Sequence, residues 1–470
     1  MQVAALVQEK NTVGIQTVIE LLSKQFGDRF STGKSLCEQH AHTTSWTQAQ
    51  APDGVVFAIS TQEVSEIVKI CAKHLVPVIP FGAGSSLEGH VNAPYGGISL
   101  DVSRMNAIVC LNAEDLDVRV QPGVTRKQLN EYLRATGLFF PIDPGADASI
   151  GGMTATRASG TNAVRYGTMK DVVLAVEVVM PDGSIIRTGG RAKKSSAGYD
   201  LTRLLIGSEG TLGVITEITL KLTGIPETIA GGRCTFPDLE SACNATIMTI
   251  QCGIPVARIE LLDTLQVQAS NAYSKLELEE APTLFLEFHG TKASVAEQSD
   301  LFQEIASDFG GGNFIWTTDP EERNKIWQAR HDAYWASRQL RPECDGVSTD
   351  ICVPISRLAE CVGQSQADLK ELDLFAPTVG HVGDGNFHML ILVNTSDDGE
   401  MARVKTFLDR LSERAIAMEG TCTGEHGIGQ GKIKYMKREH GAALDVMQSI
   451  KDAIDPNRIM NPGKILPQSQ

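Results

Sequence analysis

The chain has 470 residues, of which 42% are hydrophobic and 21% charged, a composition typical of roughly two to four soluble globular domains. Its 42 basic and 57 acidic residues give a formal net charge of −15. This excludes a general nucleic-acid binder, which needs a basic face, and a site for an anionic substrate must supply its own cations.

The N-terminus and the spacing of apolar residues bear on the compartment. No run approaches the 18 or so apolar residues of a transmembrane helix. Residues 1–10 lack the basic and apolar regions of a signal peptide and are not Arg-rich like a mitochondrial leader. The ten cysteines form no Cys-x-x-Cys pair, as expected for reduced thiols. We expect a cytoplasmic protein, or one held peripherally at the inner membrane of a bacterium.

The pattern of apolar residues and glycines changes along the chain and predicts four parts. Short β-rich runs alternate with glycine-rich turns up to about residue 225, and longer helices and strands follow. The last helix is expected to end before Asp455-Pro456. The parts are a helical lead-in (1–45), a cofactor domain (46–225), a substrate domain (226–420) and a C-terminal segment that returns to the cofactor domain (421–470).

Three stretches rich in glycine, serine and alanine lie at 81–89, 144–168 and 207–215. They leave few side chains for a core, and three independent flexible loops would waste ordering entropy. Glycines let backbone N–H groups approach an anion, so a large phosphate-bearing cofactor is the better explanation. The first stretch is neither a Rossmann fingerprint, because Leu87 replaces the third glycine, nor a Walker A loop.

The second half carries a helix with a buried cation. Asp319-Pro320-Glu321-Glu322 predicts a helix start with an N-cap aspartate. Arg330 shares an apolar face of this helix with Ile326 and Ala333. Its guanidinium fork fits a carboxylate, which belongs either to a substrate or to a protein acid.

Two histidines and an acid suggest a metal site. His381 and His388 flank Asp384-Gly385, a favoured type I′ turn, which would place the histidines opposite each other in a hairpin. Two buried histidines bonded to the backbone are the alternative. A catalytic metal needs a third ligand, for which Glu425 between glycines is the candidate; His426 beside it then faces the substrate. The alternative for this pair is a solvated surface loop.

These stretches, in this order, together with residues 424–429 and 455–464, resemble the vanillyl-alcohol oxidase / p-cresol methylhydroxylase flavoprotein superfamily. The histidine motif is similar to its metal-dependent branch of D-lactate, D-2-hydroxyglutarate and glycolate dehydrogenases. Residues 348–358 are most similar to the mitochondrial-type D-lactate enzymes, and the missing leader favours a bacterial relative. The resemblance implies an α+β fold: a two-subdomain FAD-binding domain plus an α+β cap domain with an antiparallel sheet.

The resemblance also implies site residues. FAD is expected to bind noncovalently, because Gly84-Ser85-Ser86 lacks the histidine that some relatives link to the flavin. It implies a metal on His381, His388 and Glu425, zinc first with manganese or iron also compatible. Arg330 would hold the substrate carboxylate and His426 would act as the base. The implied cofactor residues are Phe81, Gly82, Ala83, Gly84, Ser85, Ser86, Gly89, Pro144, Asp147, Ser149, Ile150, Gly151, Gly152, Ser159, Gly160, Asn162, Tyr166, Gly167, Glu209, Gly210, Gly213, Ile215 and Asn461.

We therefore expect an FAD- and metal-dependent, NAD-independent dehydrogenase that oxidises D-lactate to pyruvate. Its electrons would pass to a cytochrome, a quinone or a carrier flavoprotein. Ser348, near the lysine position of 2-hydroxyglutarate enzymes, favours a monocarboxylic substrate. Glycolate and D-2-hydroxyglutarate are alternatives within the family. A metal-dependent hydrolase is an alternative of another class, but it would leave the glycine-rich half unexplained. A noncatalytic flavin-binding protein would leave the proposed metal ligands unexplained. A homodimer is compatible with the sequence.

Overall fold

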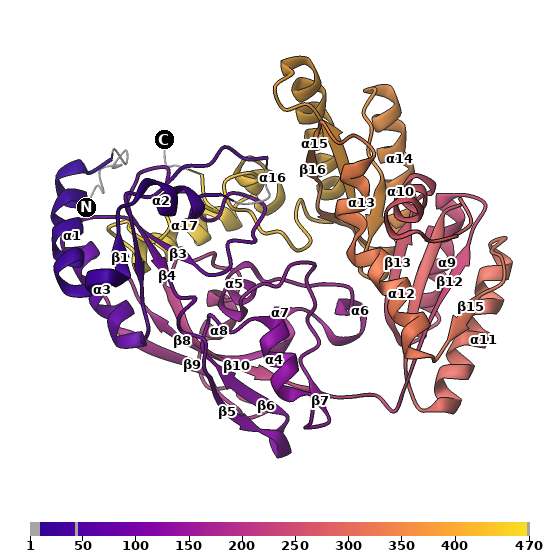
Figure 1. Cartoon of the computed structure of the whole chain (residues 1–470), viewed down its shortest axis with the longest axis horizontal. Coiled ribbons are helices and arrows are strands. Elements are labelled where there is room, and N and C mark those ends of the chain that lie inside the picture. The colour runs from indigo at the N-terminus through magenta and orange to yellow at the C-terminus, as the bar shows by residue number, and fades with distance from the viewer. Residues whose placement is uncertain (1–9, 43–45, 468–470) are drawn as a thin grey trace. The chain divides into compact units, whose positions relative to one another are not determined.

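The computed structural model describes residues 10–42 and 46–467, which form two units (Figure 1). Unit 1 contains the residues up to 159, residues 168–224 and the residues from 425 on. Unit 2 contains residues 160–167 and 225–424. This division differs from the expected parts in three respects. Residues 160–167 group with the second half, residues 421–424 also belong to unit 2, and the N-terminal helix is an integral element of unit 1.

Unit 1 is built on two main sheets (Figure 1). The first has the order β1-β2-β4-β3, with β2, β4 and β3 parallel, and the second is an antiparallel sheet of order β5-β6-β10-β8-β9. The strands are β1 (Phe30–Ser31), β2 (Gly54–Phe57), β3 (Val78–Phe81), β4 (Ile98–Asp101), β5 (Ile108–Asn112), β6 (Asp117–Val120), β8 (Val173–Val179), β9 (Ile185–Gly189) and β10 (Val214–Lys221), and β7 (Leu138–Phe139) pairs with β11 (Thr223–Gly224).

The longer helices α1 and α3 of unit 1 each bury one apolar face. In α3 the buried Val64, Ile67, Val68 and Cys71 follow the helical period and pack in one core cluster with the first sheet. The helices are α1 (Thr12–Phe26), α2 (Lys34–Gln39), α3 (Thr61–Lys73), α4 (Arg126–Leu133), α5 (Ile150–Thr156), α7 (Met169–Val172), α8 (Leu201–Leu205), α16 (Met436–His440) and α17 (Ala443–Ile454).

The C-terminal segment is fixed to the first sheet of unit 1. As predicted, α17 ends at Ile454, immediately before Asp455-Pro456. The buried Asp455 accepts hydrogen bonds from Lys451 Nζ (2.5 Å) and from the backbone N–H of Met460 (2.9 Å). Met460 then bridges to Val78 in β3, so the chain end reaches the strand that precedes the first glycine-rich stretch.

Unit 2 is a single antiparallel sheet of order β15-β12-β14-β13-β18-β19-β16, with β17 also pairing with β19. Its helices are α6 (Ala163–Tyr166), α9 (Leu239–Gln251), α10 (Thr264–Ser274), α11 (Lys292–Asp308), α12 (Pro320–His331), α13 (Ala333–Gln339), α14 (Leu358–Glu371) and α15 (Asp398–Ala417). The strands are β12 (Thr228–Thr235), β13 (Val256–Leu262), β14 (Thr283–Gly290), β15 (Ile315–Thr317), β16 (Asp345–Ser348), β17 (Ile351–Cys352), β18 (Thr378–Gly380) and β19 (Asn386–Val393).

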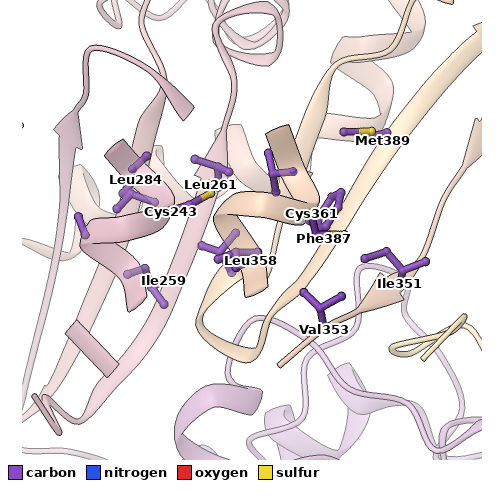
Figure 2. Packing of buried hydrophobic residues seen from close by; sticks show 14 of the residues in the cluster. Cys243, Ile259, Leu261, Leu284, Ile351, Val353, Leu358, Cys361, Phe387 and Met389 are labelled. Atoms are coloured by element: carbon purple, nitrogen blue, oxygen red, sulfur yellow. The ribbon is translucent and has the colours of Figure 1, made fainter. Parts of the chain in front are cut away.

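The two faces of this sheet are different. Ile259, Leu261, Phe387 and Met389 point to one face, where they form the main core of unit 2 with residues of α9 and α14 such as Cys243 (Figure 2). Because side chains alternate along a strand, their neighbours Glu260 and His388 point to the opposite face. That opposite face carries the smaller core cluster, which includes Trp327 of α12.

The structure confirms an α+β fold with an antiparallel sheet in the second half. Asp319 caps α12 with Pro320 in its first turn, as the sequence predicted. No disulfide joins any of the ten cysteines, all of which lie within the described residues. Across residues 10–42 and 46–467, the helices fall short of the length and apolarity needed to cross a bilayer.

Candidate functional site

The first and third glycine-rich stretches and residues 144–159 of the second converge within unit 1. A Cβ on Gly82 would lie 2.4 Å from Ser149 Oγ, so the first and second stretches touch where only glycine fits. Gly210 has φ +71°, and a Cβ there would lie 2.8 Å from Pro80 Cγ at the end of β3. The third stretch therefore lies against the strand that leads into the first.

Buried polar atoms at this junction fit a polar ligand. Ser86 Oγ, His90 Nδ1 and Asn461 Oδ1 are buried and make no hydrogen bond within the described part of the chain. Asn461 Nδ2 donates to the carbonyl oxygens of Glu209 (2.7 Å) and His90 (3.2 Å), which fixes Asn461 beside both segments. Since buried polar groups are normally satisfied, these atoms fit a cofactor such as FAD, which is rich in donors and acceptors.

Glu209 has a structural use in addition to its predicted cofactor contact. Its carboxylate accepts hydrogen bonds from the backbone N–H of Ile428 (2.7 Å) and Gly429 (2.9 Å), and it lies 3.3 Å from His90 Nε2. Burial raises the pKa of Glu209, but His90 and the two backbone donors more than offset this, so the net pKa is lowered. The ionised side chain holds residues 428 and 429 in unit 1.

We expect Glu209→Gln to lower the free energy of unfolding by about 1–3 kcal/mol, because one amide oxygen cannot replace two carboxylate oxygens facing buried N–H groups. The first transition in a thermal melt checks this. Because the folded pKa is depressed, the difference should persist above the ordinary pKa of 4.5 and disappear as pH falls through the lowered value. Glu131→Gln, which removes an exposed pair with Arg134, is the matched control and should cost under about 0.5 kcal/mol.

The other predicted cofactor residues of unit 1 lie on the same segments. Ile150 and Ile215 direct their side chains into the core of the second sheet, so only their backbone could face a cofactor. Ser149 caps α5. The remaining residues are Phe81, Ala83, Gly84, Ser85 and Gly89 in the first stretch, Pro144, Asp147, Gly151, Gly152 and Ser159 in the second, and Gly213 before β10.

Four predicted cofactor residues belong instead to unit 2: Gly160, Asn162, Tyr166 and Gly167. Asn162 Oδ1 accepts a hydrogen bond from Arg258 Nε of β13 at 2.9 Å. The Tyr166 hydroxyl lies 2.6 Å from His289 Nδ1, and His289 Nε2 lies 2.7 Å from Glu287. Side chains of β13 and β14 thus fix this short segment, which the sequence assigned to the cofactor domain.

His381 and His388 come together in unit 2, with ring centroids 5.3 Å apart and ring planes at 81°. The predicted register is wrong, because His388 pairs with Val379 rather than with His381. Val382–Asp384 form a 3-10 turn instead of a two-residue hairpin turn, and Gly385 follows with φ +78°. A Cβ on Gly385 would lie 2.0 Å from the carbonyl oxygen of Val353, so the longer turn packs against the segment that contains Val353.

Both imidazoles are oriented through Nδ1. The Nδ1–H of His388 donates to the carbonyl oxygen of Thr349 at 2.9 Å, and that of His381 donates to Glu260 Oε1 at 2.7 Å. The lone pair of each ring then lies on Nε2, as in histidines that bind metals. One ligand atom of each histidine lies within 4.8 Å of the other, so the pair fits a single ion.

Glu260 is a functional candidate that sequence reasoning missed. Its side chain is fully buried, and Oε2 accepts a hydrogen bond from Arg330 Nε at 2.7 Å. Burial raises the pKa of Glu260, but His381 and Arg330 more than offset this and lower it overall. The structure therefore provides the protein acid that was one of the two partners open to Arg330. An isolated acid within the apolar run Ile259–Leu262 was the available signal.

Asp350 is a buried acid that lies near His388. Its Oδ1 lies 4.0 Å from His388 Nδ1 and accepts a hydrogen bond from Asn386 Nδ2 at 2.9 Å, while Oδ2 accepts one from the Thr423 hydroxyl. Its contact with His388 is at Nδ1, not at the Nε2 that would bind a metal. Asp350, also missed from sequence, therefore belongs to the surroundings of the histidine.

Glu425 and His426 begin the last part of unit 1. Glu425 follows Gly424, which ends unit 2; a Cβ on Gly424 would lie 2.3 Å from Asn386 Nδ2 and 3.0 Å from Asp350 Oδ1. Within unit 1, Glu425 Oε2 accepts a hydrogen bond from Ser159 Oγ at 3.0 Å. Gly424 itself packs against Asn386 and Asp350 of unit 2.

Comparisons with known proteins identify the family of the chain. Residues 52–189 match a family described as "FAD binding domain" and residues 225–465 match "FAD linked oxidases, C-terminal domain". The chain is 49% identical to a probable mitochondrial D-lactate dehydrogenase of Danio rerio, over 98% of this chain and 93% of that protein. It is 46% identical to a mitochondrial D-lactate dehydrogenase (cytochrome) of Arabidopsis thaliana, over 96% and 79%.

Among solved structures, p-cresol methylhydroxylase with substrate bound matches with a TM-score of 0.75 and 17% identity, over 97% of each chain. At that identity the match shows the fold alone, and it confirms the predicted p-cresol methylhydroxylase type. The chain therefore belongs to the FAD-linked oxidase family and is an FAD-dependent oxidoreductase.

Proposed function

We propose that the chain oxidises D-2-hydroxy acids with FAD and a divalent metal ion, and that D-lactate, converted to pyruvate, is its main substrate. The observation that carries this proposal is the juxtaposition, on one face of the unit 2 sheet, of Arg330 with the His381–His388 pair through Glu260. A 2-hydroxy carboxylate offers a carboxylate for a guanidinium and a hydroxyl oxygen for a metal. The names of the two relatives support D-lactate.

Both groups would be held by residues described above. FAD would lie along the three glycine-rich stretches, with Asn461 near its isoalloxazine, and the metal on His381, His388 and Glu425. When bound, FAD supplies the two-electron redox chemistry and the metal the Lewis acidity that lowers the pKa of the C2 hydroxyl. Two imidazoles and a carboxylate suit zinc, and manganese or iron is compatible.

The chain's own side chains then have three tasks. Glu260 holds Arg330 through Nε, and the Nη groups of Arg330 bind the substrate carboxylate. The Nδ1–H bonds of His381 and His388 orient both imidazoles. His426 takes the proton of the C2 hydroxyl, a task suited to an imidazole because its ordinary pKa lies near neutral pH.

The substrate class is proposed from the same face. Ser348 ends β16, which pairs with β19, and a serine there offers no cation for a second carboxylate. This favours a monocarboxylic acid over D-2-hydroxyglutarate. Glycolate, which differs from D-lactate only in lacking the methyl group on C2, is the alternative. Membership of an FAD-linked oxidase family leaves the hydrolase alternative without support.

An anaerobic titration of the flavoprotein tests the proposal. D-lactate should bleach the yellow absorption of the FAD-loaded, metal-loaded protein, and L-lactate should not. Glycolate and D-2-hydroxyglutarate, tested in parallel, distinguish the alternatives within the family. Unchanged flavin absorption with all four acids would contradict the proposed activity.

Arg330→Lys should lower kcat/KM for D-lactate by well over tenfold, or more than about 1.4 kcal/mol of transition-state stabilisation. A lysine can keep an ion pair with Glu260, but it loses the planar fork that also reaches the substrate. Steady-state kinetics with an artificial electron acceptor measures this. An unchanged kcat/KM would mean that Arg330 serves only as the ion-pair partner of Glu260.

The electron acceptor and the compartment are proposed separately. A cytochrome, a quinone or an electron-transfer flavoprotein could each accept the electrons, and the Arabidopsis relative's name favours a cytochrome. Both relatives are called mitochondrial, whereas we propose that this chain is cytoplasmic or is held peripherally at the inner membrane of a bacterium. Fractionation of the source cells, with immunodetection of the protein, tests the location.

A further inference from the structure

We infer that Glu260 is a positioning residue that couples the metal ion to the substrate-binding arginine. The inference rests on the proposed function, because it assigns Glu260 to the metal and carboxylate sites proposed above. It goes beyond that function by predicting that one side chain, which touches neither ligand, controls the affinity for both.

The geometry uses each carboxylate oxygen once. Oε1 accepts the Nδ1–H of His381 and Oε2 accepts the Nε–H of Arg330, both at 2.7 Å. Arg330 is 13% exposed and Glu260 is fully buried, so solvent does not compete for these bonds. Charge-assisted hydrogen bonds of this length are the stronger kind, and they fix both partners in direction as well as distance.

Three elements far apart in the sequence meet at this carboxylate. Glu260 lies in β13, Arg330 in α12, and His381 directly after β18, which pairs with β13. Leu261 of β13 pairs with Gly380 of β18 in the antiparallel ladder. Glu260 and His381 are the next residues beyond this pair, one on each side of the ladder. The position of the acid is therefore set by sheet register and that of the arginine by the helix.

Only a carboxylate can serve both partners. Both face it with N–H groups, so two acceptors are required. Glutamine at this position would offer one oxygen and one NH₂ group, and the NH₂ would meet either the guanidinium or the Nδ1–H of His381. Either the arginine loses its anchor or His381 loses the bond that fixes its metal-binding tautomer.

The consequence is a thermodynamic coupling. Moving His381 changes the metal site, moving Arg330 changes the substrate site, and Glu260 restrains both at once. By linkage, metal binding should strengthen substrate binding in the wild-type protein, and this reciprocal effect should shrink when Glu260 is altered.

The test uses the FAD-loaded protein, stripped of metal with a chelator and titrated with Zn²⁺ against a chromophoric competitor. Glu260→Gln should bind zinc about 10–100-fold more weakly than wild type. With saturating zinc its KM for D-lactate should rise by about tenfold or more, since its arginine is no longer anchored. Glu260→Asp keeps the charge but is one methylene shorter, and it covers the case in which the glutamine variant fails to fold.

Asp368→Asn is the matched control. Asp368 is a largely buried acid of unit 2 that pairs with Arg410 at 3.0 Å and with Arg414, and it lies in α14 on the main-core face. This variant loses the same charge and a comparable buried network. Its zinc affinity and KM should stay within about twofold of wild type even if its melting temperature falls, as expected for a site outside the coupled network.

The outcomes separate this inference from the proposed function. If wild type oxidises D-lactate and the Glu260 variants keep wild-type zinc affinity and KM, the coupling is overturned and the function stands. A second case is that wild type does not oxidise D-lactate, yet 2-hydroxy acids bind and change the flavin absorption. If the affinities for zinc and for these acids then fall together only in the Glu260 variants, the coupling stands and the function fails. Equal losses in Asp368→Asn, or no zinc binding by wild type, would overturn the inference.

Discussion

Replacing His388 with alanine is expected to leave a yellow protein that holds no metal at stoichiometric concentration and has almost no turnover. The substitution removes one of two imidazoles whose rings lie 5.3 Å apart, so His381 would have to bind the ion with Glu425 alone. FAD should remain bound, because none of its proposed residues lies in β19. Metal analysis of the purified variant beside its visible spectrum measures both properties at once.

The control for His388→Ala is His440→Ala. His440 ends α16 in unit 1 with a side chain 33% exposed, and it belongs to no part of the proposed site. That variant should keep the metal, the flavin and the wild-type rate. Full metal occupancy in His388→Ala would contradict the histidine pair as the metal site, and loss of flavin together with the metal would point to a folding defect instead.

Local signals in the sequence predicted the elements that depend on local physics. The end of α17 before Asp455-Pro456 and the start of α12 at Asp319-Pro320 follow from the restrictions that proline places on its neighbours. The glycine-rich stretches were recognisable because glycine is needed where backbones touch. Gly82, where a Cβ would meet the Ser149 side chain, shows that glycine is also needed where a side chain approaches the backbone closely, although the sequence alone did not say which stretches would meet.

The histidine pair shows where local reasoning stops. The Asp384-Gly385 dipeptide favours a two-residue turn, but a 3-10 turn forms and the register shifts, so that His388 lies opposite Val379. The histidines still meet, because His381 directly follows β18, which pairs with the strand β19 that carries His388. In this longer turn Gly385 packs against Val353, and its carbonyl oxygen accepts a hydrogen bond from the Val353 N–H at 3.0 Å, a contact that the dipeptide alone does not reveal.

Glu260 could not be predicted as a site residue because its importance comes from two long-range neighbours, His381 and Arg330. In the sequence it is one acid in a strand, and only the pairing of β13 with β18 and the packing of α12 bring His381 and Arg330 to it. The same reason explains why residues 160–167 were assigned to the first half. Their anchors, Arg258 and His289, lie about 90 and 120 residues further along the chain.

The adjacent residues Glu425 and His426 are expected to fail in different ways when they are replaced. Glu425→Gln should weaken metal binding, because an amide oxygen is a poorer ligand than a carboxylate, and added metal should restore part of the activity. The hydrogen bond from Ser159 can still be accepted by the amide oxygen, so the segment should keep its place in unit 1. Titration of the activity with Zn²⁺ measures this rescue.

His426→Ala should keep its metal and its flavin, yet D-lactate should reduce that flavin about 10²–10⁴-fold more slowly, the usual share of a general base. The loss should shrink as pH rises, since the C2 hydroxyl of the substrate can then lose its proton to hydroxide in solvent without the imidazole. Rapid-mixing measurements of flavin reduction across a range of pH give both the size and the slope of the effect. If His426→Ala loses its metal while Glu425→Gln retains it, the two roles are reversed: the imidazole is the third ligand and the carboxylate the base.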